Sequence, residues 1–122
     1  MYELTVVSTF SSAHNLRGYE GACENLHGHN WKVEAVIASP GLDKLGMVMD
    51  FKKLKESVGR ILDSLDHRYL NEVPPFDREN ATAENLARFI YQELSKALGK
   101  GDVSVLRVRV WESDTSAAAY YE

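Results

Sequence analysis

The sequence is poor in cysteine, carries no excess of positive charge and has no long hydrophobic run. Its single cysteine cannot form an internal disulfide, which fits the reducing cytosol. Lysine and arginine number 14 against 18 acidic residues, so the formal net charge is −4, whereas non-specific nucleic-acid binding needs clustered cations. No run of about 18 apolar residues is present, and no basic, apolar leader follows Met1. We therefore expect a cytoplasmic protein that binds neither nucleic acid nor membranes.

Repeats, low-complexity segments and flexible linkers are also absent from the sequence. The 122 residues, 44% of them hydrophobic, are enough to bury one core but not two. We therefore expect a single domain over residues 1–122.

Alternation of apolar and polar residues predicts strands near both ends of the chain. The pattern covers residues 2–10 and 29–38 in the first half. It returns over residues 103–111, and a shorter strand is expected at about 117–121.

Two segments between these strand pairs show apolar residues at helical spacing. The first begins after Asp50, which can cap it, and the second begins after Thr82, with Gly99 as its expected end. The order ββααββ predicts an α+β fold, in which an antiparallel four-stranded sheet carries both helices on one face. Such a sheet leaves one face and two edges uncovered, so we expect a homo-oligomer.

Three histidines form the sharpest local pattern. His27 and His29 are two residues apart and therefore point to one side of an extended chain, while His14 lies just past the first strand. Three histidines without a fourth protein ligand are typical of a catalytic zinc site with one open position. Imidazole also suits copper, iron and nickel, so residue type alone leaves the metal open. The competing interpretation of His27 and His29 is a pair of surface histidines.

Cys23 lies four residues before His27, among loop-forming residues. A lone cysteine is most often a buried small hydrophobe. Next to a dication, however, its pKa would fall, and the thiolate could act as a base or a nucleophile. It could also be a fourth metal ligand, which would give a closed structural site.

Asp66 and His67 are predicted to lie at the end of the first helix. One interpretation is a C-terminal imidazolium that is stabilised by the helix dipole. The functional interpretation is an acid–base pair, in which the carboxylate holds the imidazole in one tautomer.

Glu112 continues the apolar side of the third predicted strand, after Leu106, Val108 and Val110. An unpaired carboxylate on such a face would be costly. Either the strand ends before Glu112 and the side chain is solvated, or Glu112 is a buried anion that awaits a ligand rich in hydrogen-bond donors.

Together these segments resemble the 6-pyruvoyl-tetrahydropterin synthase / 6-carboxytetrahydropterin synthase family. Phe10-Ser11-Ser12-Ala13-His14 is similar to the family's F-S-A-A-H opening, and the segment from Cys23 to His29 is similar to its Cys-x-x-x-His-Gly-His element. Later blocks match in the same order: Gly46-Met47-Val48-Met49-Asp50-Phe51, Leu65-Asp66-His67-Arg68-Tyr69-Leu70-Asn71, Ala81-Thr82-Ala83-Glu84-Asn85-Leu86 and Trp111-Glu112. The resemblance covers essentially the whole chain.

The resemblance implies a tunnelling fold (T-fold), in which trimers close their sheets into a barrel and two trimers stack into a hexamer. It places the active sites between subunits. It also implies a small-molecule substrate, a pterin triphosphate.

The resemblance also implies a role for each candidate residue. His14, His27 and His29 match the zinc ligands. Cys23 matches the catalytic base, and Glu112 matches the carboxylate that anchors the amino-pyrimidine edge of the pterin. Asp66 and His67 match the acid–base partners of the cysteine. Thr82 matches a threonine near the pterin pocket.

The spacing of the cysteine implies one branch of the family. Three residues separate Cys23 from His27, as in bacterial 6-carboxytetrahydropterin synthases, whereas pyruvoyl-forming members typically have five. Those bacterial enzymes are zinc-dependent carbon–carbon lyases that convert 7,8-dihydroneopterin triphosphate to 6-carboxy-5,6,7,8-tetrahydropterin, acetaldehyde and triphosphate on the way to queuosine.

Glu24 keeps an alternative open. Another branch has a glutamate three residues before the first histidine, in place of the cysteine, and makes 6-hydroxymethyl-7,8-dihydropterin for folate. This chain has both Cys23 and Glu24, so dual activity is a further interpretation. Glu24 could equally be a solvated loop carboxylate. The alternative to an enzyme is a non-catalytic zinc- or pterin-binding module.

Overall fold

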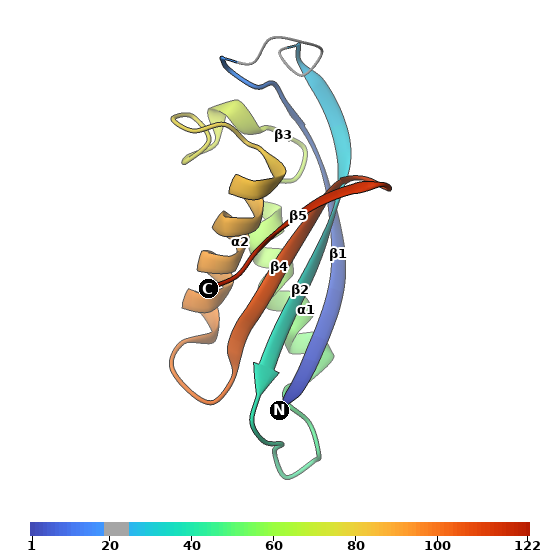
Figure 1. The fold of residues 1–122 in the computed structure, drawn as a ribbon, viewed down its shortest axis with the longest axis vertical. Coiled ribbons are helices and arrows are strands. Elements are labelled where there is room, and N and C mark those ends of the chain that lie inside the picture. The colour runs from blue at the N-terminus through green and yellow to red at the C-terminus, as the bar shows by residue number, and fades with distance from the viewer. Residues whose placement is uncertain (19–24) are drawn as a thin grey trace.

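A long antiparallel hairpin forms the centre of the fold (Figure 1). In the computed structural model, which describes residues 1–18 and 25–122, β1 spans Tyr2–His14 and β2 spans His27–Ser39. The pairing runs without a break from Tyr2 opposite Ser39 to His14 opposite His27. Both strands are therefore longer than predicted, because the ladder continues to the histidines at the end of the hairpin.

The sheet has five strands in the order β3-β1-β2-β4-β5. The predicted strands near the C-terminus are β4 (Ser104–Ser113) and β5 (Ser116–Tyr120), and both pair antiparallel. The expectation of four antiparallel strands misses β3 (Arg68–Tyr69), which pairs parallel with Ser12 and Ala13 of β1. Two residues show no detectable alternation, so this strand depends on how the chain after the first helix returns to the sheet.

The two predicted helices and their caps are confirmed. Helix α1 spans Phe51–Asp63, and the Asp50 side chain accepts the N–H of Lys52 at 2.8 Å. Helix α2 spans Ala83–Leu98, with Thr82 as its N-cap and Gly99 at its end in a positive-φ conformation. A single turn of 3-10 helix, η2, covers Leu70–Glu72.

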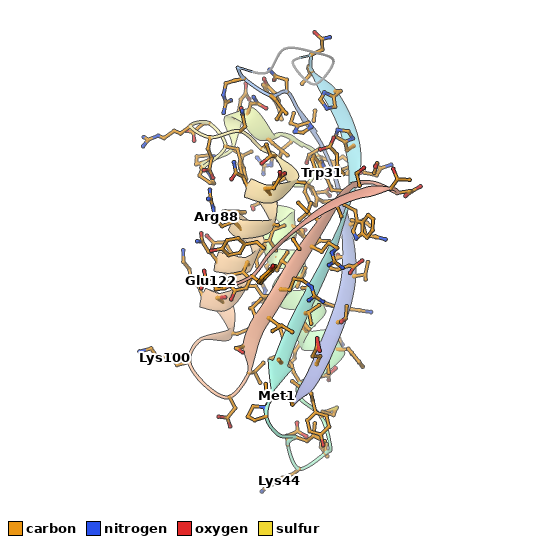
Figure 2. All side chains as sticks on the ribbon, in the orientation of Figure 1. Met1, Trp31, Lys44, Arg88, Lys100 and Glu122 are labelled. Carbon is orange, nitrogen blue, oxygen red and sulfur yellow. The ribbon has the colours of Figure 1, made fainter. Side chains whose placement is uncertain are left out.

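Both helices cover the same face of the sheet, which we call the helix-covered face (Figure 1). We call the opposite side the helix-free face. Alternate residues of β1 and β2, among them Phe10, Trp31 and Val33, are buried against the helices. At about 25 cal/mol per Å² of apolar surface removed from water, this shared core is the main stabilising contribution. In Figure 2, Trp31 lies toward the histidine end of the hairpin, and Met1 and Lys44 lie at the other end.

The predicted alternation of β4 fails at Leu106. The β2–β4 register shifts, so that Val36 pairs with Arg107 but the next residue pairs with Val105. This bulge leaves Leu106 39% exposed and places Val105 in the core. The expectation that Leu106 shares a face with Val108 is therefore wrong, because an inserted residue reverses the alternation.

Among the helices of the described ranges, none combines the length and the apolar character needed to cross a membrane.

Candidate active site

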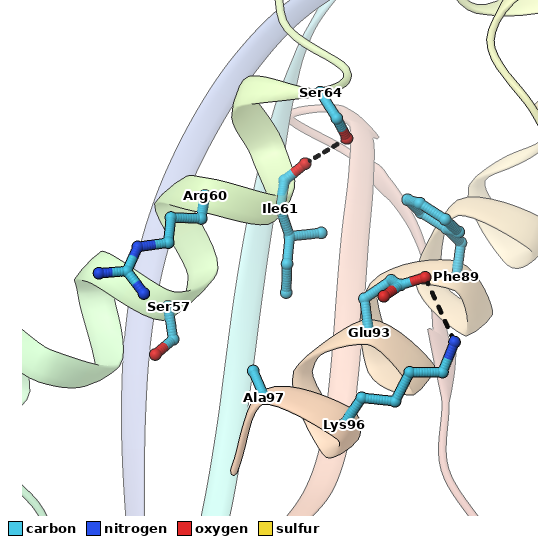
Figure 3. A pocket seen from close by; sticks show the side chains of 8 residues that line it. All are labelled: Ser57, Arg60, Ile61, Ser64, Phe89, Glu93, Lys96 and Ala97. Carbon is cyan, nitrogen blue, oxygen red and sulfur yellow. Dashed lines mark hydrogen bonds and ion pairs between the residues drawn. The ribbon is translucent and has the colours of Figure 1, made fainter. Parts of the chain in front are cut away.

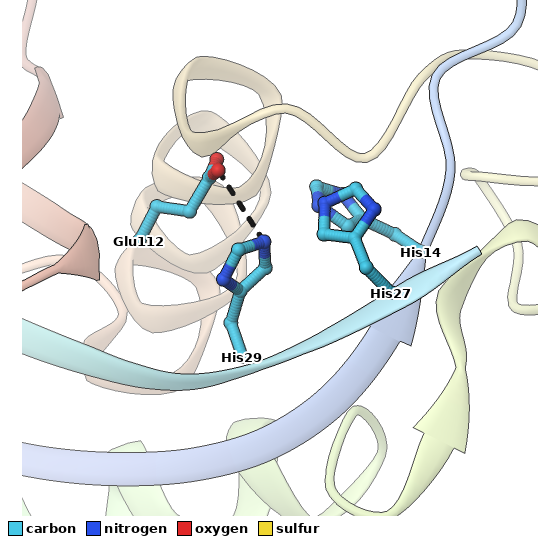
Figure 4. Close-up of side chains that lie close together, drawn as sticks. All are labelled: His14, His27, His29 and Glu112. Carbon is cyan, nitrogen blue, oxygen red and sulfur yellow. Dashed lines mark ion pairs between the residues drawn. The ribbon is translucent and has the colours of Figure 1, made fainter. Parts of the chain in front are cut away.

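The hairpin register brings three histidines together, which we call the histidine cluster (Figure 4). His14 and His27 face each other across the last pair of the ladder, and His29 lies two residues further along the same side of β2. The ring centroids of His14 and His27 are 4.5 Å apart, and those of His27 and His29 are 4.7 Å apart. The rings lie beyond the N-terminal end of α2, on the helix-covered face.

Backbone carbonyl groups select the tautomers of two of these rings. The Nδ1 atom of His14 lies 2.8 Å from the carbonyl oxygen of Ala81, and that of His27 lies 2.6 Å from the carbonyl oxygen of Asn25. A carbonyl can only accept, so each Nδ1 carries the proton and each Nε2 keeps its lone pair. The Nε2 atom of His14 is buried and has no hydrogen-bond partner in the described part of the chain. This is the usual arrangement around a metal-binding histidine.

Burial also favours the neutral form of two rings of the cluster, His14 and His29. His14 is 1% exposed, and burial lowers its pKa below the ordinary value of 6.5 against the opposing effect of the Ala81 carbonyl. Burial lowers the pKa of His29 as well, although the negative charge of Glu112 acts in the opposite direction. Neutral imidazoles near pH 7 are the form that binds a metal ion.

Glu112 completes the group, although neither predicted environment describes it fully. The strand β4 continues to Ser113, and the β4–β5 register shifts between Trp111 and Ser113, so Glu112 lies at a bulge. The side chain is 33% exposed, and its Oε1 atom lies 3.3 Å from Nε2 of His29 (Figure 4). One ligand atom from each histidine and one from Glu112 lie within 4.8 Å of one another, so these four residues could hold a metal ion.

Trp31 forms the floor of the histidine cluster, a role that the sequence pattern did not predict. Its indole is fully buried, and its ring centroid lies 5.1 Å from that of His14 and 5.0 Å from that of His29, both edge to face. Phe10 stacks on the indole at 6.0 Å. The position of Trp31, two residues after His29, could have predicted this contact, because the two side chains lie on one side of the strand.

A groove of about 280 Å³ begins at Glu112, and we call it the Glu112 groove. Glu84, in the first turn of α2, also lines it and was not among the predicted site residues. The hydroxyl group of Thr82 accepts the N–H of Asn85 at 3.1 Å, so its side chain already caps the helix. The full lining is Ala83, Glu84, Glu112, Ser113, Ser116, Ala117 and Ala118.

Asp66 and His67 lie in the turn after α1, because the helix ends at Asp63, before the predicted end. Their side chains meet, with Nδ1 of His67 2.9 Å from Oδ2 of Asp66. Backbone hydrogen bonds tie both residues to Ser11, whose N–H donates to Asp66 and whose carbonyl accepts the N–H of His67. The Ser11 N–H, followed by the hydrogen bond from His67, lowers the pKa of Asp66 below its ordinary value of 3.8.

The Asp66–His67 turn lies outside the group of four candidate metal ligands. His67 is 83% exposed and lines a groove of about 540 Å³ together with Ser11, Asn30 and Arg68, and His29 of the histidine cluster also borders this groove. Ser11 and Asn30, which hydrogen-bond to each other, alternate along their strands with residues of the helix-covered face. The structure therefore places the Asp66–His67 turn at the helix-free side of the sheet edge. Cys23 and Glu24 lie outside the described residues.

A broader groove of about 620 Å³ runs between α1 and α2 (Figure 3). Three of its polar side chains already have partners, since Lys96 pairs with Glu93 and Ser64 donates to the carbonyl of Ile61. None of the predicted site residues lines this groove among the described residues. The site therefore lies at the histidine end of the hairpin.

Comparisons with known proteins identify the family of the chain. The sequence model described as 6-pyruvoyl tetrahydropterin synthase matches residues 3–122. The 6-carboxy-5,6,7,8-tetrahydropterin synthase of Haemophilus influenzae is 34% identical, with 100% of both chains covered. The dihydroneopterin monophosphate aldolase of Pyrococcus furiosus is 39% identical over 88% of this chain and 86% of its own.

The fold has a solved relative in Caenorhabditis elegans 6-pyruvoyl tetrahydropterin synthase. The TM-score is 0.86 at 27% identity, and the match covers 99% of this chain and 95% of that one. The predicted α+β tunnelling fold is therefore confirmed, with the short β3 as the difference. The resemblance inferred from the motifs is confirmed as well, and the chain belongs to the 6-pyruvoyl tetrahydropterin synthase family.

Proposed function

We propose that this protein is a zinc-dependent 6-carboxytetrahydropterin synthase. It would convert 7,8-dihydroneopterin triphosphate to 6-carboxy-5,6,7,8-tetrahydropterin, acetaldehyde and triphosphate, a step toward queuosine and other 7-deazapurines. The observation that carries the proposal is the convergence of three histidines beside a carboxylate at the mouth of a groove. Several relatives that match most of this chain have the corresponding name.

His14, His27 and His29 are the residues that would hold zinc, and their donor chemistry fits it. Nitrogen ligands at neutral pH suit Zn²⁺, and the unpaired Nε2 atom of buried His14 needs a partner. When bound, zinc would polarise the oxygen atoms of the substrate side chain.

Glu112 would accept the N–H donors on the amino-pyrimidine edge of the pterin. A carboxylate that receives two parallel N–H groups makes a strong charge-assisted contact. The Glu112 groove gives such a ring a place beside the histidine cluster, and Thr82 directly precedes Ala83, which lines the groove at the start of α2.

Cys23 would remove the proton from the substrate side chain, and Asp66 and His67 would transfer protons with it. Asp66 faces Nδ1 of His67, which leaves Nε2 of the exposed imidazole as the proton carrier. Because this turn lies on the other side of the sheet edge from the histidine cluster, we infer that it acts in the site of a second copy. The edge of β5, and the edge of β1 beyond its two-residue pairing with β3, support such pairing, and we propose a hexamer of two trimers with interfacial sites.

A second candidate function follows from Glu24 and from the aldolase of Pyrococcus furiosus. In that case the side chain would be cleaved to leave 6-hydroxymethyl-7,8-dihydropterin, as the only activity or beside the first one. Pyruvoyl formation and a non-catalytic zinc- or pterin-binding module are further alternatives. The predicted cytoplasmic location rests on the single cysteine and stays a prediction.

Product analysis tests these alternatives. The zinc-loaded protein is incubated with 7,8-dihydroneopterin triphosphate, and the pterins are separated by chromatography. We expect 6-carboxytetrahydropterin and acetaldehyde from the wild type and almost none from Cys23→Ala, which should keep its zinc. A hydroxymethyl product that persists in Cys23→Ala and disappears in Glu24→Gln would establish the second activity. Ring binding without any product would leave a binding module.

A further inference from the structure

We propose that Glu112 is a removable fourth ligand of the metal. In the absence of a pterin its carboxylate closes the metal site, and a ring that enters the Glu112 groove draws it away. This inference rests on the proposed metal and ring sites, and it gives one residue two successive partners.

The first support is the distance between Glu112 and His29. A tetrahedral zinc ion with bonds of about 2.0–2.1 Å holds its ligand atoms about 3.3–3.4 Å apart. The Oε1 atom of Glu112 lies 3.3 Å from Nε2 of His29, which is the length of one such edge. All four candidate ligand atoms lie within 4.8 Å of one another, so small side-chain movements would complete the tetrahedron.

The second support is that this contact is not a hydrogen bond. Nε2 of His29 is buried and has no hydrogen-bond partner among the described residues, although Oε1 of Glu112 lies 3.3 Å away. The other side chains of the group offer two further imidazoles and no cation. A cation between the carboxylate and the imidazole would satisfy both atoms at once.

The third support is the position of Glu112 in the strand. Glu112 lies at the β4–β5 bulge, and bulges commonly redirect a side chain next to a site. Its side chain belongs both to the histidine cluster and to the Glu112 groove. Two N–H donors of a ring in that groove would engage both carboxylate oxygens, which takes them from the metal.

The consequence is a metal whose open position depends on the ring. With four protein ligands, a zinc site is closed, as structural sites are, whereas a catalytic site keeps one position free. Release of Glu112 would therefore open the position for the oxygen atoms of the substrate side chain only when the ring is bound.

The metal affinity of the substrate-free protein gives the first test. Zinc dissociation constants are measured by chelator competition for wild type, Glu112→Gln, Glu112→Asp and Glu84→Gln. Glu84 is the matched control, because it is a second carboxylate that lines the same groove outside the four-residue group. We expect Glu112→Gln to weaken zinc binding about tenfold or more and Glu84→Gln to leave it unchanged.

The aspartate variant separates ligation from charge. It keeps the negative charge but is one methylene shorter, so it should also lose zinc affinity if Glu112 is a ligand. Wild-type affinity in Glu112→Asp would show that only the charge matters, and wild-type affinity in Glu112→Gln would overturn the proposal directly. Circular dichroism checks that each variant is folded, and either Glu112 variant decides the question if the other fails to fold.

Release of the ligand is tested with cobalt-loaded protein and pterin itself, whose ring has no side chain that could reach the metal. We expect the ring to change the visible Co²⁺ spectrum in wild type but not in Glu112→Gln. Ring binding without a spectral change, or no ring binding, would overturn the release step. The ligand role and the proposed reaction can fail separately. If zinc affinity falls in Glu112→Gln but the wild type forms no 6-carboxytetrahydropterin, the ligand role stands and the proposed reaction fails.

Discussion

The histidine cluster and the Asp66–His67 turn lie near the same end of the hairpin but are built in opposite ways. The histidines of the cluster occupy paired positions of β1 and β2 and lie on the helix-covered face, and two of them contact the buried indole of Trp31. The turn is exposed and is tied to the sheet edge through the backbone of Ser11. We therefore expect one chain to be enough to bind a metal, whereas proton transfer should need a second chain.

The largest expected effect is a loss of zinc, which should occur in variants of the histidine cluster but not in variants of the Asp66–His67 turn. His29→Ala removes one of the converging imidazoles, so zinc affinity should fall on the order of a hundredfold or more and activity should be lost with it. His67→Ala should lose activity but keep its zinc, because His67 lies outside the cluster. Metal analysis after dialysis measures this, and loss of zinc from His67→Ala would contradict the separation of the two regions.

Mixed oligomers test whether the two regions serve one site from different chains. Each of the two variants alone should be inactive, but their co-assembly should restore roughly a quarter of wild-type activity, since half the chains carry each intact region. Activity is measured on co-expressed protein of hexameric mass, with each single variant as control. An inactive mixture of correct mass would mean that both regions must come from the same chain.

Packing should matter more in the buried region than at the exposed turn. Trp31→Phe keeps an aromatic ring but leaves space under His14 and His29, so stability should fall by about 1–2 kcal/mol. Zinc affinity should fall a few-fold with it. Phe10→Leu is the matched control, because Phe10 stacks on Trp31. This substitution should lower stability but change zinc affinity less than Trp31→Phe does. Denaturant unfolding and chelator competition measure the two effects, and unchanged zinc affinity in Trp31→Phe would exclude a positioning role.

The pH dependence of the exposed turn should be a weaker effect than any of these. The Ser11 N–H and His67 lower the pKa of Asp66 in the folded state, so its ionisation favours folding at pH values above the ordinary 3.8. This contribution is lost as the pH falls through the lower, folded pKa. Asp66→Asn should therefore lower the melting temperature slightly at pH 7 and have less effect in acid, whereas exposed Asp63→Asn should show a smaller dependence. A melting-temperature difference between wild type and Asp66→Asn that grows as the pH falls would contradict the lowered pKa of Asp66.

Much of the fold followed from local pattern. Asp50 and Thr82 precede helical periodicity and cap the two helices, and the alternation of apolar residues placed the long strands. The spacing of His27 and His29 alone puts both side chains on one side of a strand. These features could be predicted because each depends on residues within a few positions of one another.

The remaining features depend on contacts between distant segments. The bulge that turns Leu106 outward and the pairing of β3 with β1 are register choices between strands, and no local pattern encodes them. The carbonyls of Ala81 and Asn25, which select the tautomers of His14 and His27, are backbone groups that every residue has.

The amino-acid sequence alone specifies which side chains are available for a metal and for proton transfer. Their placement is a tertiary property: the histidines and Glu112 meet in one group, while Asp66 and His67 pair with each other in the turn after α1, outside that group. It could not be predicted from local pattern, because it depends on how the hairpin register and the turn after α1 meet at one sheet edge.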